Sequence, residues 1–262
     1  MVTIAHISDL HCSKVTHGKI GFRPKKLLSC IKEINKLKPD LVVVTGDLTA
    51  FGFEEEFQLA KKYLSKIKPH TLVIPGNHDS RYCGYDYFDE HFGHGNIAIT
   101  LPGIDIIGID TTVPDLDGGN VGRGKLRWLL GELEKMPKKN CKIVAMHHHL
   151  IPVPGTGRER ATIADAGTVL EALVRAGVDV VLCGHKHTPY SWFINNVAIV
   201  NAGSVSAVKL RAHINNSYNI IRIENGAVDV LLKEIGKKPE IMAAYKTAVS
   251  KKGLFVRSVQ EK

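Results

Sequence analysis

Five short segments of this sequence carry side chains of the kinds that bind metal ions in proteins. In chain order they are Asp9-Leu-His11, Gly46-Asp47, Gly76-Asn-His-Asp79, His147-His-His149 and Gly184-His-Lys-His187. Imidazole, carboxylate and amide oxygen without thiolate suit Mn, Fe, Zn or Ni rather than a structural zinc site. A single aspartate is more often a turn residue or a helix cap, and a single histidine is usually a surface or core residue. The five segments together therefore predict a metal centre.

The spacing within two of these segments suits coordination. Asp9 and His11 are two residues apart, so on an extended chain both side chains would face the same way and could hold one ion. His185 and His187 repeat this spacing. At roughly 6–7 Å along a strand, each of them could serve one of two neighbouring ions. We therefore expect two ions side by side.

The chemistry of such a pair of ions is hydrolytic. Asn77 and His78 follow the turn signal Pro75-Gly76, and a turn lets one neighbour coordinate a metal while the other faces the substrate. Two divalent ions about 3.5–4 Å apart could clamp the attacking and leaving oxygens of an in-line displacement. With Asp9 and Asp47 they leave a formal charge of about +2, or about +1 with a bound hydroxide, which attracts a phosphate ester.

Each of the five segments directly follows an apolar run that is typical of a strand. Strands are expected at residues 2–8, 41–46, 71–75, 97–101, 104–109, 142–147 and 178–183. Between some of them, apolar residues recur at helical spacing within residues 27–37, 53–67, 126–133 and 166–174. This alternation predicts parallel β-α-β units with helices on the faces of a sheet. Because the carboxyl ends of parallel strands share one edge, the five segments would converge there.

The pattern changes after residue 190. Short strands are expected at residues 192–194, 197–200, 218–223 and 227–232, separated by turn signals such as Asn195-Asn196 and Asn225-Gly226. They would form an antiparallel run that closes the sheet system. We expect one domain over residues 1–235. A helix from Glu240 to about Ser250 and a basic tail would complete the same domain over residues 236–262.

The ordered set of segments resembles the calcineurin-like metallophosphoesterase superfamily, whose signature is D-x-H, G-D, G-N-H-D/E, an isolated His and G-H-x-H. All five blocks are present, in order, over residues 9–187. Within the superfamily the sequence looks most like the class III cyclic-nucleotide phosphodiesterases, on the cues Ile7-Ser-Asp-Leu-His11, Trp128-Leu-Leu, the His147-His148 pair and Asn201-Ala-Gly-Ser204. The resemblance implies a four-layer α/β/β/α sandwich of two mixed sheets flanked by helices, in agreement with the alternation of elements.

The resemblance also implies roles for single residues. The first ion would be held by Asp9, His11 and His187, the second by Asn77, His147 and His185, with Asp47 bridging both. His78 would stay off the ions and give a hydrogen bond or a proton to the phosphoryl oxygen or the leaving group. Either His147 or His148 could be the ligand. We favour His147 because it stands first after the strand, and we place His148 near the substrate or behind the ligands.

Three arginines are candidates for holding the phosphate. Arg123, Arg158 and Arg160 lie in Gly- and Pro-containing stretches, where a guanidinium could grip a phosphate through two hydrogen bonds. Ordinary loop arginines would give the same pattern. Residues 118–124 are rich in glycine but lack the Lys-Ser/Thr of a phosphate-binding P-loop, so we expect a flexible loop on the substrate side.

The bulk properties fit a cytoplasmic protein with an anionic partner. The formal net charge of +9 favours acidic partners, although many of the lysines are explained as solvated surface residues. Five cysteines without a C-x-x-C pair indicate reduced thiols. The longest apolar runs fall far short of the roughly 20 residues needed to cross a membrane, and the first residues lack the pattern of a secretory signal. Composition does not indicate an oligomeric state.

The expected function is hydrolysis of a small anionic phosphodiester by a hydroxide on two divalent transition-metal ions, with Mn or Fe favoured over Zn and Ni. A cyclic nucleotide is the leading substrate, and a phosphomonoester, a glycerophosphodiester or a nucleotide-sugar pyrophosphate are alternatives. A DNA or RNA nuclease would suit the basic charge, but 6% aromatic residues without a stacking pattern disfavour it. A non-catalytic scaffold of the same fold would be expected to have lost ligands, and here none is missing.

Overall fold

Two six-stranded sheets pack face to face in the computed structural model, which describes residues 1–15, 21–156, 162–211 and 214–246. In the first sheet the strands run in the order β12 (Glu240–Lys246), β11 (Ala227–Glu234), β10 (Ser217–Glu224), β1 (Val2–Ile7), β2 (Leu41–Thr45) and β3 (Thr71–Ile74). In the second the order is β4 (Ile97–Leu101), β5 (Ile104–Gly108), β6 (Cys141–Ala145), β7 (Val180–Cys183), β9 (Val197–Asn201) and β8 (Tyr190–Ile194).

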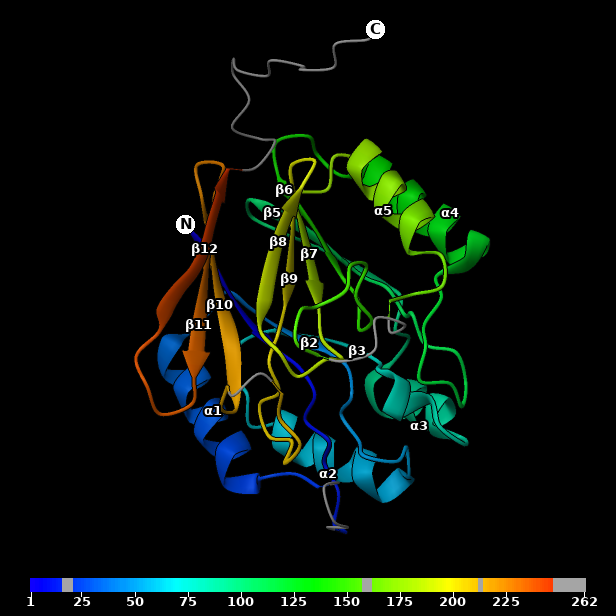
Figure 1. The fold of residues 1–262 in the computed structure, drawn as a ribbon, viewed down its shortest axis with the longest axis vertical. Coiled ribbons are helices and arrows are strands. Elements are labelled where there is room, and N and C mark those ends of the chain that lie inside the picture. Colours follow the sequence, from blue (N-terminus) through cyan, green and yellow to red (C-terminus); the bar gives the residue numbers. More distant parts are fainter. Residues whose placement is uncertain (16–20, 157–161, 212–213, 247–262) are drawn as a thin grey trace, which may run out of the picture.

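Helices cover the outer face of each sheet and complete the four layers that the sequence predicts. On the first sheet lie α1 (Pro24–Leu37) and α2 (Glu54–Leu64), and on the second α4 (Gly122–Lys135) and α5 (Ala166–Arg175) (Figure 1). A further helix, α3 (Gly84–Phe92), packs Phe88 against Phe57 of α2 with ring centroids 6.5 Å apart. Helix α3 was not predicted from the sequence. Among the described residues no helix is long and apolar enough to cross a membrane.

Strand β2 illustrates why this sequence builds layers. All five of its residues are buried, because a strand in the interior of the sandwich is covered on both faces. Leu41 and Val43 point into the core between the two sheets, whereas Val42 and Val44 point into the core beneath α1 and α2. A third core lies between the second sheet and helices α4 and α5. An unbroken apolar run is therefore what this position requires.

The strand directions bring the expected metal ligands to one edge. Strands β1, β2 and β3 are mutually parallel, and so are β5, β6, β7 and β9. Just beyond the strand ends, the backbone N–H of Asp9 donates to the carbonyl of Gly46 at 3.0 Å, and that of Gly184 to the carbonyl of His147 at 2.9 Å. The loops that follow the parallel strands thus meet at the carboxyl ends.

The helix expected from Glu240 is wrong. Residues Glu240–Lys246 form the edge strand β12, which pairs antiparallel with β11. Its alanines, Met242 and lysine are good helix formers, but intrinsic propensity is a weak influence that tertiary contacts override. Here Met242, Ala243 and Tyr245 pack against the core between the sheets while the segment pairs with β11. The remainder of the expected helix, residues 247–250, lies outside the described residues.

Candidate metal centre

Four of the expected ligands form a first cluster at the edge of the sheets. The ligand atoms of Asp9, His11, Asp47 and His187 all lie within 4.8 Å of one another. The Nε2 atoms of His11 and His187 are 2.9 Å apart, and Nε2 of His187 is 3.3 Å from Oδ1 of Asp9. Two atoms that each lie at about 2.1 Å from an ion, at right angles, are about 3 Å apart. The cluster thus has the spacing of a coordination shell.

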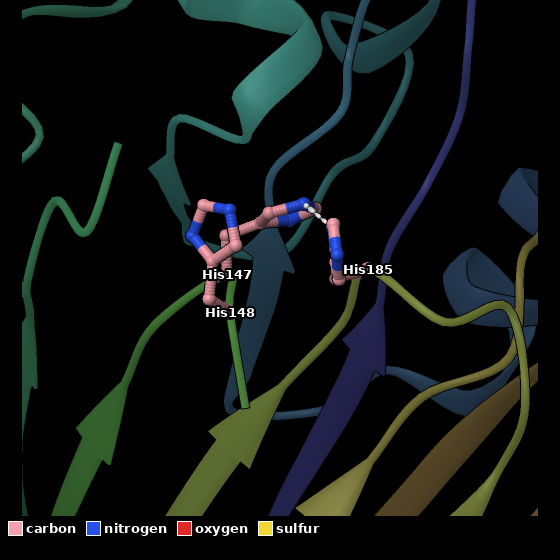
Figure 2. Close-up of side chains that lie close together, drawn as sticks. All are labelled: His147, His148 and His185. Atoms are coloured by element: carbon pink, nitrogen blue, oxygen red, sulfur yellow. Dashed lines mark hydrogen bonds between the residues drawn. The ribbon is translucent and has the colours of Figure 1, made fainter. Parts of the chain in front are cut away.

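A second cluster joins Asn77, His147 and His185. The Oδ1 atom of Asn77 is 3.0 Å from Nε2 of His147 and 2.9 Å from Nδ1 of His185. The two ring nitrogens are themselves 3.2 Å apart, and Figure 2 shows the rings turned toward each other from separate loops. These three atoms again have the spacing of ligands around one ion.

Asp47 lies between the two clusters. Its Oδ2 is 3.5 Å from Nε2 of His11 in the first cluster, and its Oδ1 is 3.4 Å from Nε2 of His147 in the second. Oδ1 also accepts a hydrogen bond from the backbone N–H of His78 at 2.9 Å. One carboxylate therefore reaches both groups of ligand atoms, as a bridging ligand must.

Hydrogen bonds behind the clusters fix which ring nitrogens are free. Nδ1 of His147 is 2.7 Å from the carbonyl oxygen of Thr45, and Nδ1 of His187 is 2.6 Å from that of Lys209. A carbonyl can only accept, so both Nδ1 atoms carry the proton. Nε2 of each ring then faces its cluster, the arrangement found behind metal-bound histidines.

His148 differs from His147 in this respect. Its nitrogens lie near those of His147 and His185, within 4.8 Å, so proximity alone makes it a candidate ligand. However, Nε2 is 3.2 Å from the carbonyl of Asp117 and must donate to it, while Nδ1 lies 2.8 Å from Oγ1 of Thr111 and accepts from that hydroxyl. Both nitrogens are already engaged, so neither has a free lone pair for an ion.

The backbone at the clusters is not extended. Asp9, His11, Asp47, His185 and His187 have φ values of 56°, 50°, 52°, 75° and 54°, in the left-handed region that residues other than glycine rarely adopt. The expectation that the Asp9/His11 and His185/His187 pairs are spaced along extended chain is therefore wrong, because β1 ends at Ile7 and β7 at Cys183. Such conformations cost about 1–3 kcal/mol each and concentrate at functional sites.

Two glycines allow the loops of Asp47 and Asn77 to touch. Gly46 has a φ of +81°, and a Cβ built on it would lie 2.7 Å from the carbonyl carbon of Pro75. A Cβ on Gly76 would overlap the backbone nitrogen and Oδ1 of Asp47. A side chain at either position would push the two loops apart, and one at Gly76 would displace the carboxylate of Asp47.

Asp79 holds the same two loops together. No role was predicted for it from the sequence. Its fully buried carboxylate accepts hydrogen bonds from the backbone N–H groups of Leu48, Thr49 and Gly76 at 2.9–3.0 Å. Burial and the nearby charge of Asp47 raise the pKa of Asp79 to about 6. The signal that could have found it is its position three residues after Gly76, the spacing of a helix start whose side chain bonds back to the backbone.

Asp117 is a second residue that the sequence did not indicate. Its Oδ1 accepts a hydrogen bond from Nδ2 of Asn77 at 3.3 Å, which leaves Oδ1 of Asn77 pointing at the second cluster. Arg81 donates to the same oxygen at 2.7 Å, and this hydrogen bond holds the pKa of Asp117 below its usual value. Asp117 lies 40 residues from Asn77, so no local pattern predicts the contact.

His78 lies against the clusters without joining either group of ligand atoms. Its Nδ1 is 2.5 Å from the carbonyl oxygen of Ala50 and therefore carries the proton, which makes Nε2 the nitrogen that can exchange one. Its ring meets that of His11 edge to face, with centroids 4.6 Å apart. Asn77 thus faces the second cluster and His78 does not, so the two neighbours are directed differently, as the turn before them predicts.

The electrostatics of the clusters favour cations. Burial and the neighbouring positive groups lower the pKa of His11 and His185 well below 6.5, so both rings are neutral at neutral pH. Burial opposes ionisation of Asp9, but the charge and hydrogen bond of His187 hold the pKa of Asp9 below its usual value. Burial lowers the pKa of His187, but the charge and hydrogen bond of Asp9 raise it above its usual value, so this ring must give up a proton when an ion binds. The neutral rings of His11 and His185 beside the ionised Asp9 form a donor set that fits divalent ions.

Of the three expected phosphate-binding arginines, the structure describes Arg123 alone. Arg123 is exposed in the first turn of α4, so its assignment to a loop is wrong. Arg158 and Arg160 lie outside the described residues. The expected flexible loop at residues 118–124 is held in place, because Asp165 accepts from the N–H groups of Val121 and Gly122 at 3.1 and 2.8 Å.

Proteins of similar sequence are named as phosphodiesterases. Residues 2–189 match the family profile described as calcineurin-like phosphoesterase. A probable glycerophosphodiester phosphodiesterase from Arcobacter nitrofigilis is 32% identical over 78% of both chains. A 3',5'-cyclic-nucleotide phosphodiesterase from a Nostoc species is 26% identical over 78% of both, and a 3',5'-cyclic AMP phosphodiesterase from Escherichia coli is 24% identical over 82% of this chain and 80% of its own.

Solved structures share the fold at much lower identity. A dimetal phosphatase from Danio rerio superposes with a TM-score of 0.68 at 12% identity, covering 94% of this chain and 99% of its own. A purple acid phosphatase from yellow lupin gives a TM-score of 0.70 at 14% identity, over 93% of this chain and 53% of its own. The two-sheet sandwich is thus common to proteins whose sequences have largely diverged.

Proposed function

The chain belongs to the calcineurin-like phosphoesterases, and we propose that it is a phosphodiesterase with a dinuclear metal centre. The family expected from the five sequence segments is confirmed, and with it a hydrolase acting on phosphoester bonds. The observation that carries the proposal is Asp47, whose two oxygens lie 3.4 and 3.5 Å from ring nitrogens of different clusters. Two ions joined by one carboxylate is the arrangement that this geometry supports best.

The proposed ligand sets follow the two clusters. Asp9, His11 and His187 would hold the first ion, Asn77, His147 and His185 the second, and Asp47 both. The separations near 3 Å between ligand atoms support this division, as does the direction of Nε2 in His147 and His187. Nitrogen and oxygen donors without thiolate suit Mn or Fe, with Zn or Ni as alternatives.

When bound, two such ions supply an activated water and neutralise charge on the phosphoryl group. The protein's own part is to orient and to move a proton. The Ala50 carbonyl fixes the ring of His78 through Nδ1, so Nε2 would carry the proton that goes to the leaving-group oxygen. The bond from the His78 backbone N–H to Asp47 ties this acid to the bridging carboxylate.

For the substrate we propose a small phosphodiester, with a cyclic nucleotide as the leading case. Relatives at 24–26% identity are named as cyclic-nucleotide phosphodiesterases, whereas the Arcobacter relative at 32% is named for glycerophosphodiesters. Both classes present a phosphate with two ester bonds and one negative charge. A glycerophosphodiester is therefore the second candidate.

The test is hydrolysis by the purified chain, stripped of metal and reloaded with Mn, Fe, Zn or Ni in turn. Bis(p-nitrophenyl) phosphate and p-nitrophenyl phosphate compare diester with monoester, and cyclic AMP and glycerophosphocholine compare the two substrate classes. We expect about two ions per chain by elemental analysis and a preference for diesters. Turnover of the monoester alone would contradict the proposal, as would a single ion per chain in the active enzyme. A gel shift with DNA that weakens with salt would instead favour a nuclease.

A further inference from the structure

A groove of about 330 Å³ is lined in part by residues that closely follow the proposed site residues in the chain. The residues that line it include Ser13, Phe51, Phe53, Glu55, Glu56 and Tyr82. Its volume is at the lower end of the range for sites that bind small organic ligands, which are mostly apolar with a few polar groups. The proposed mechanism uses none of these side chains.

Three chain segments run directly from the centre into the wall of the groove. Ser13 is two residues after His11. Phe51 follows Ala50, whose carbonyl holds Nδ1 of His78 at 2.5 Å. Tyr82 is four residues after His78, and these two segments touch, because a Cβ on Gly52 would lie 3.0 Å from the carbonyl oxygen of His78. The backbone around His78 thus contacts the segment that carries Phe51 and Phe53.

The wall of the groove is a ladder of three nearly parallel aromatic rings. The rings of Phe51 and Phe53 have centroids 6.0 Å apart at an angle of 29°, and those of Phe53 and Tyr82 are 5.4 Å apart at 15°. Phe53 is 43% exposed and Tyr82 is 63% exposed, so two of the three rings present surface to solvent. A flat ring that stacks on them would cover this apolar surface.

The charges around the ladder restrict what can bind. Glu55 is exposed, and the buried carboxylate of Glu56 accepts the backbone N–H of Phe51 at 2.7 Å. Lys14, also exposed, is the one cation among the groove-lining residues that the structure describes. This balance of two carboxylates and one ammonium disfavours an anionic occupant. It favours an uncharged ring whose N–H groups can donate to a carboxylate.

We infer that this groove binds the nucleobase of the substrate, with Phe53 and Tyr82 as the stacking surface. The inference rests on the proposed function, since it assigns the organic part of a phosphodiester whose phosphate lies at the ions. Stacking of a base on an aromatic side chain tolerates any base. The groove thus selects nucleotides as a class over phosphodiesters of glycerol.

The experiment compares AMP with ribose 5-phosphate, two ligands that differ only in the base. Inhibition constants are measured against hydrolysis of bis(p-nitrophenyl) phosphate, and dissociation constants by calorimetry. We expect AMP to bind about 5- to 150-fold more tightly, the range that stacking of one base contributes. Phe53→Ala and Tyr82→Ala together should remove most of this difference and leave ribose 5-phosphate unchanged. Phe193→Ala is the matched control, because Phe193 is 44% exposed on β8.

Three outcomes would overturn the inference. AMP and ribose 5-phosphate could bind the unaltered protein equally, or the double variant could weaken both ligands alike. The variant could also lose turnover of glycerophosphocholine while AMP binding stays the same, which would make the groove a site for an organic cation. Failure of the proposed function is a separate result: the unaltered protein would then cleave no diester, while calorimetry would still compare the two ligands.

Discussion

The carbonyl oxygen of Thr45, at the end of β2, accepts a hydrogen bond from Nδ1 of His147, beyond the end of β6, at 2.7 Å. This bond joins the two sheets and directs Nε2 of His147 into the second cluster. Its neighbour His148 uses both ring nitrogens on Thr111 and Asp117. The adjacent residues His147 and His148 therefore differ in which ring nitrogens are free.

The first prediction concerns this pair. His147→Ala should lower the metal content from about two ions per chain to about one, because it removes a ligand of the second ion. His148→Ala is the matched control and should keep both ions after dialysis. Elemental analysis measures the result. Equal losses in the two variants would mean that His148 is also a ligand.

Asp47→Ala should empty both positions, since the carboxylate contacts ring nitrogens of both clusters at 3.4 and 3.5 Å. The same dialysis and elemental analysis apply. Asp89→Ala, which removes an exposed carboxylate of α3, should retain the full metal content. One ion retained at full occupancy in Asp47→Ala would show that a cluster can hold its ion without the bridge.

His78→Ala should keep the metal content and lose most of kcat, by about 10²- to 10⁴-fold, the usual contribution of a positioned acid. Its ring is held by Ala50 and is not among the clustered ligand atoms, which is why the ions should stay. Steady-state kinetics and elemental analysis are done on the same preparation. A variant without metal would mean that His78 is a ligand after all.

Asp117→Ala should loosen the second ion selectively. It removes the acceptor that holds Nδ2 of Asn77 and should weaken metal affinity by about 10- to 100-fold, as is typical when a partner of a ligand is lost. Calorimetric titration of the stripped protein with manganese should reveal one unchanged and one weakened step. Asp115→Ala, in the same loop, is the control, because its carboxylate bonds the backbone of Tyr82 instead. Two unchanged steps would exclude a positioning role.

The stability of the metal-free protein should fall as pH falls below 6.5. Burial lowers the pKa of His6 to about 3, so the folded protein keeps this ring neutral while the unfolded chain takes up a proton. The stability that this lowered pKa contributes is fully present above pH 6.5. It is lost progressively as the pH falls toward about 3, at about 1.4 kcal/mol per pH unit. Urea unfolding at pH 7 and pH 5 should show a drop that is about 2 kcal/mol smaller in His6→Gln than in the unaltered protein. An equal drop in the free energy of unfolding between pH 7 and pH 5 in the two proteins would rule this out.

The types and order of the site residues could be predicted from sequence because each segment follows an apolar strand. Residues 41–46 illustrate this: β2 is buried on both faces, and Asp47 follows at its carboxyl end. The alternation of strands and helices likewise predicted the parallel β-α-β units, whereas the second sheet was implied by the resemblance to the family. Local patterns of this kind indicate where a strand ends. Because parallel strands share one carboxyl edge, the residues that follow them lie close together.

What could not be predicted depends on contacts between distant residues. The left-handed backbone at Asp9 and His11 is imposed by their backbone bonds to Gly46 and Asp47 in another loop. Strand β12 forms because β11 offers it an edge, against the helical tendency of its own residues. The proton positions on His147 and His148 follow from the carbonyls of Thr45 and Asp117, which no spacing along the chain indicates.

The clusters draw on both sheets, and this has a consequence for how the protein comes to be active. Asp9, Asp47 and Asn77 follow strands of the first sheet, whereas His147, His185 and His187 follow strands of the second. A nascent chain that has emerged only as far as residue 80 has every donor of the first sheet and none of the second. We therefore expect hydrolysis only from a chain in which both sheets have formed, which includes β10, the neighbour of β1 in the first sheet.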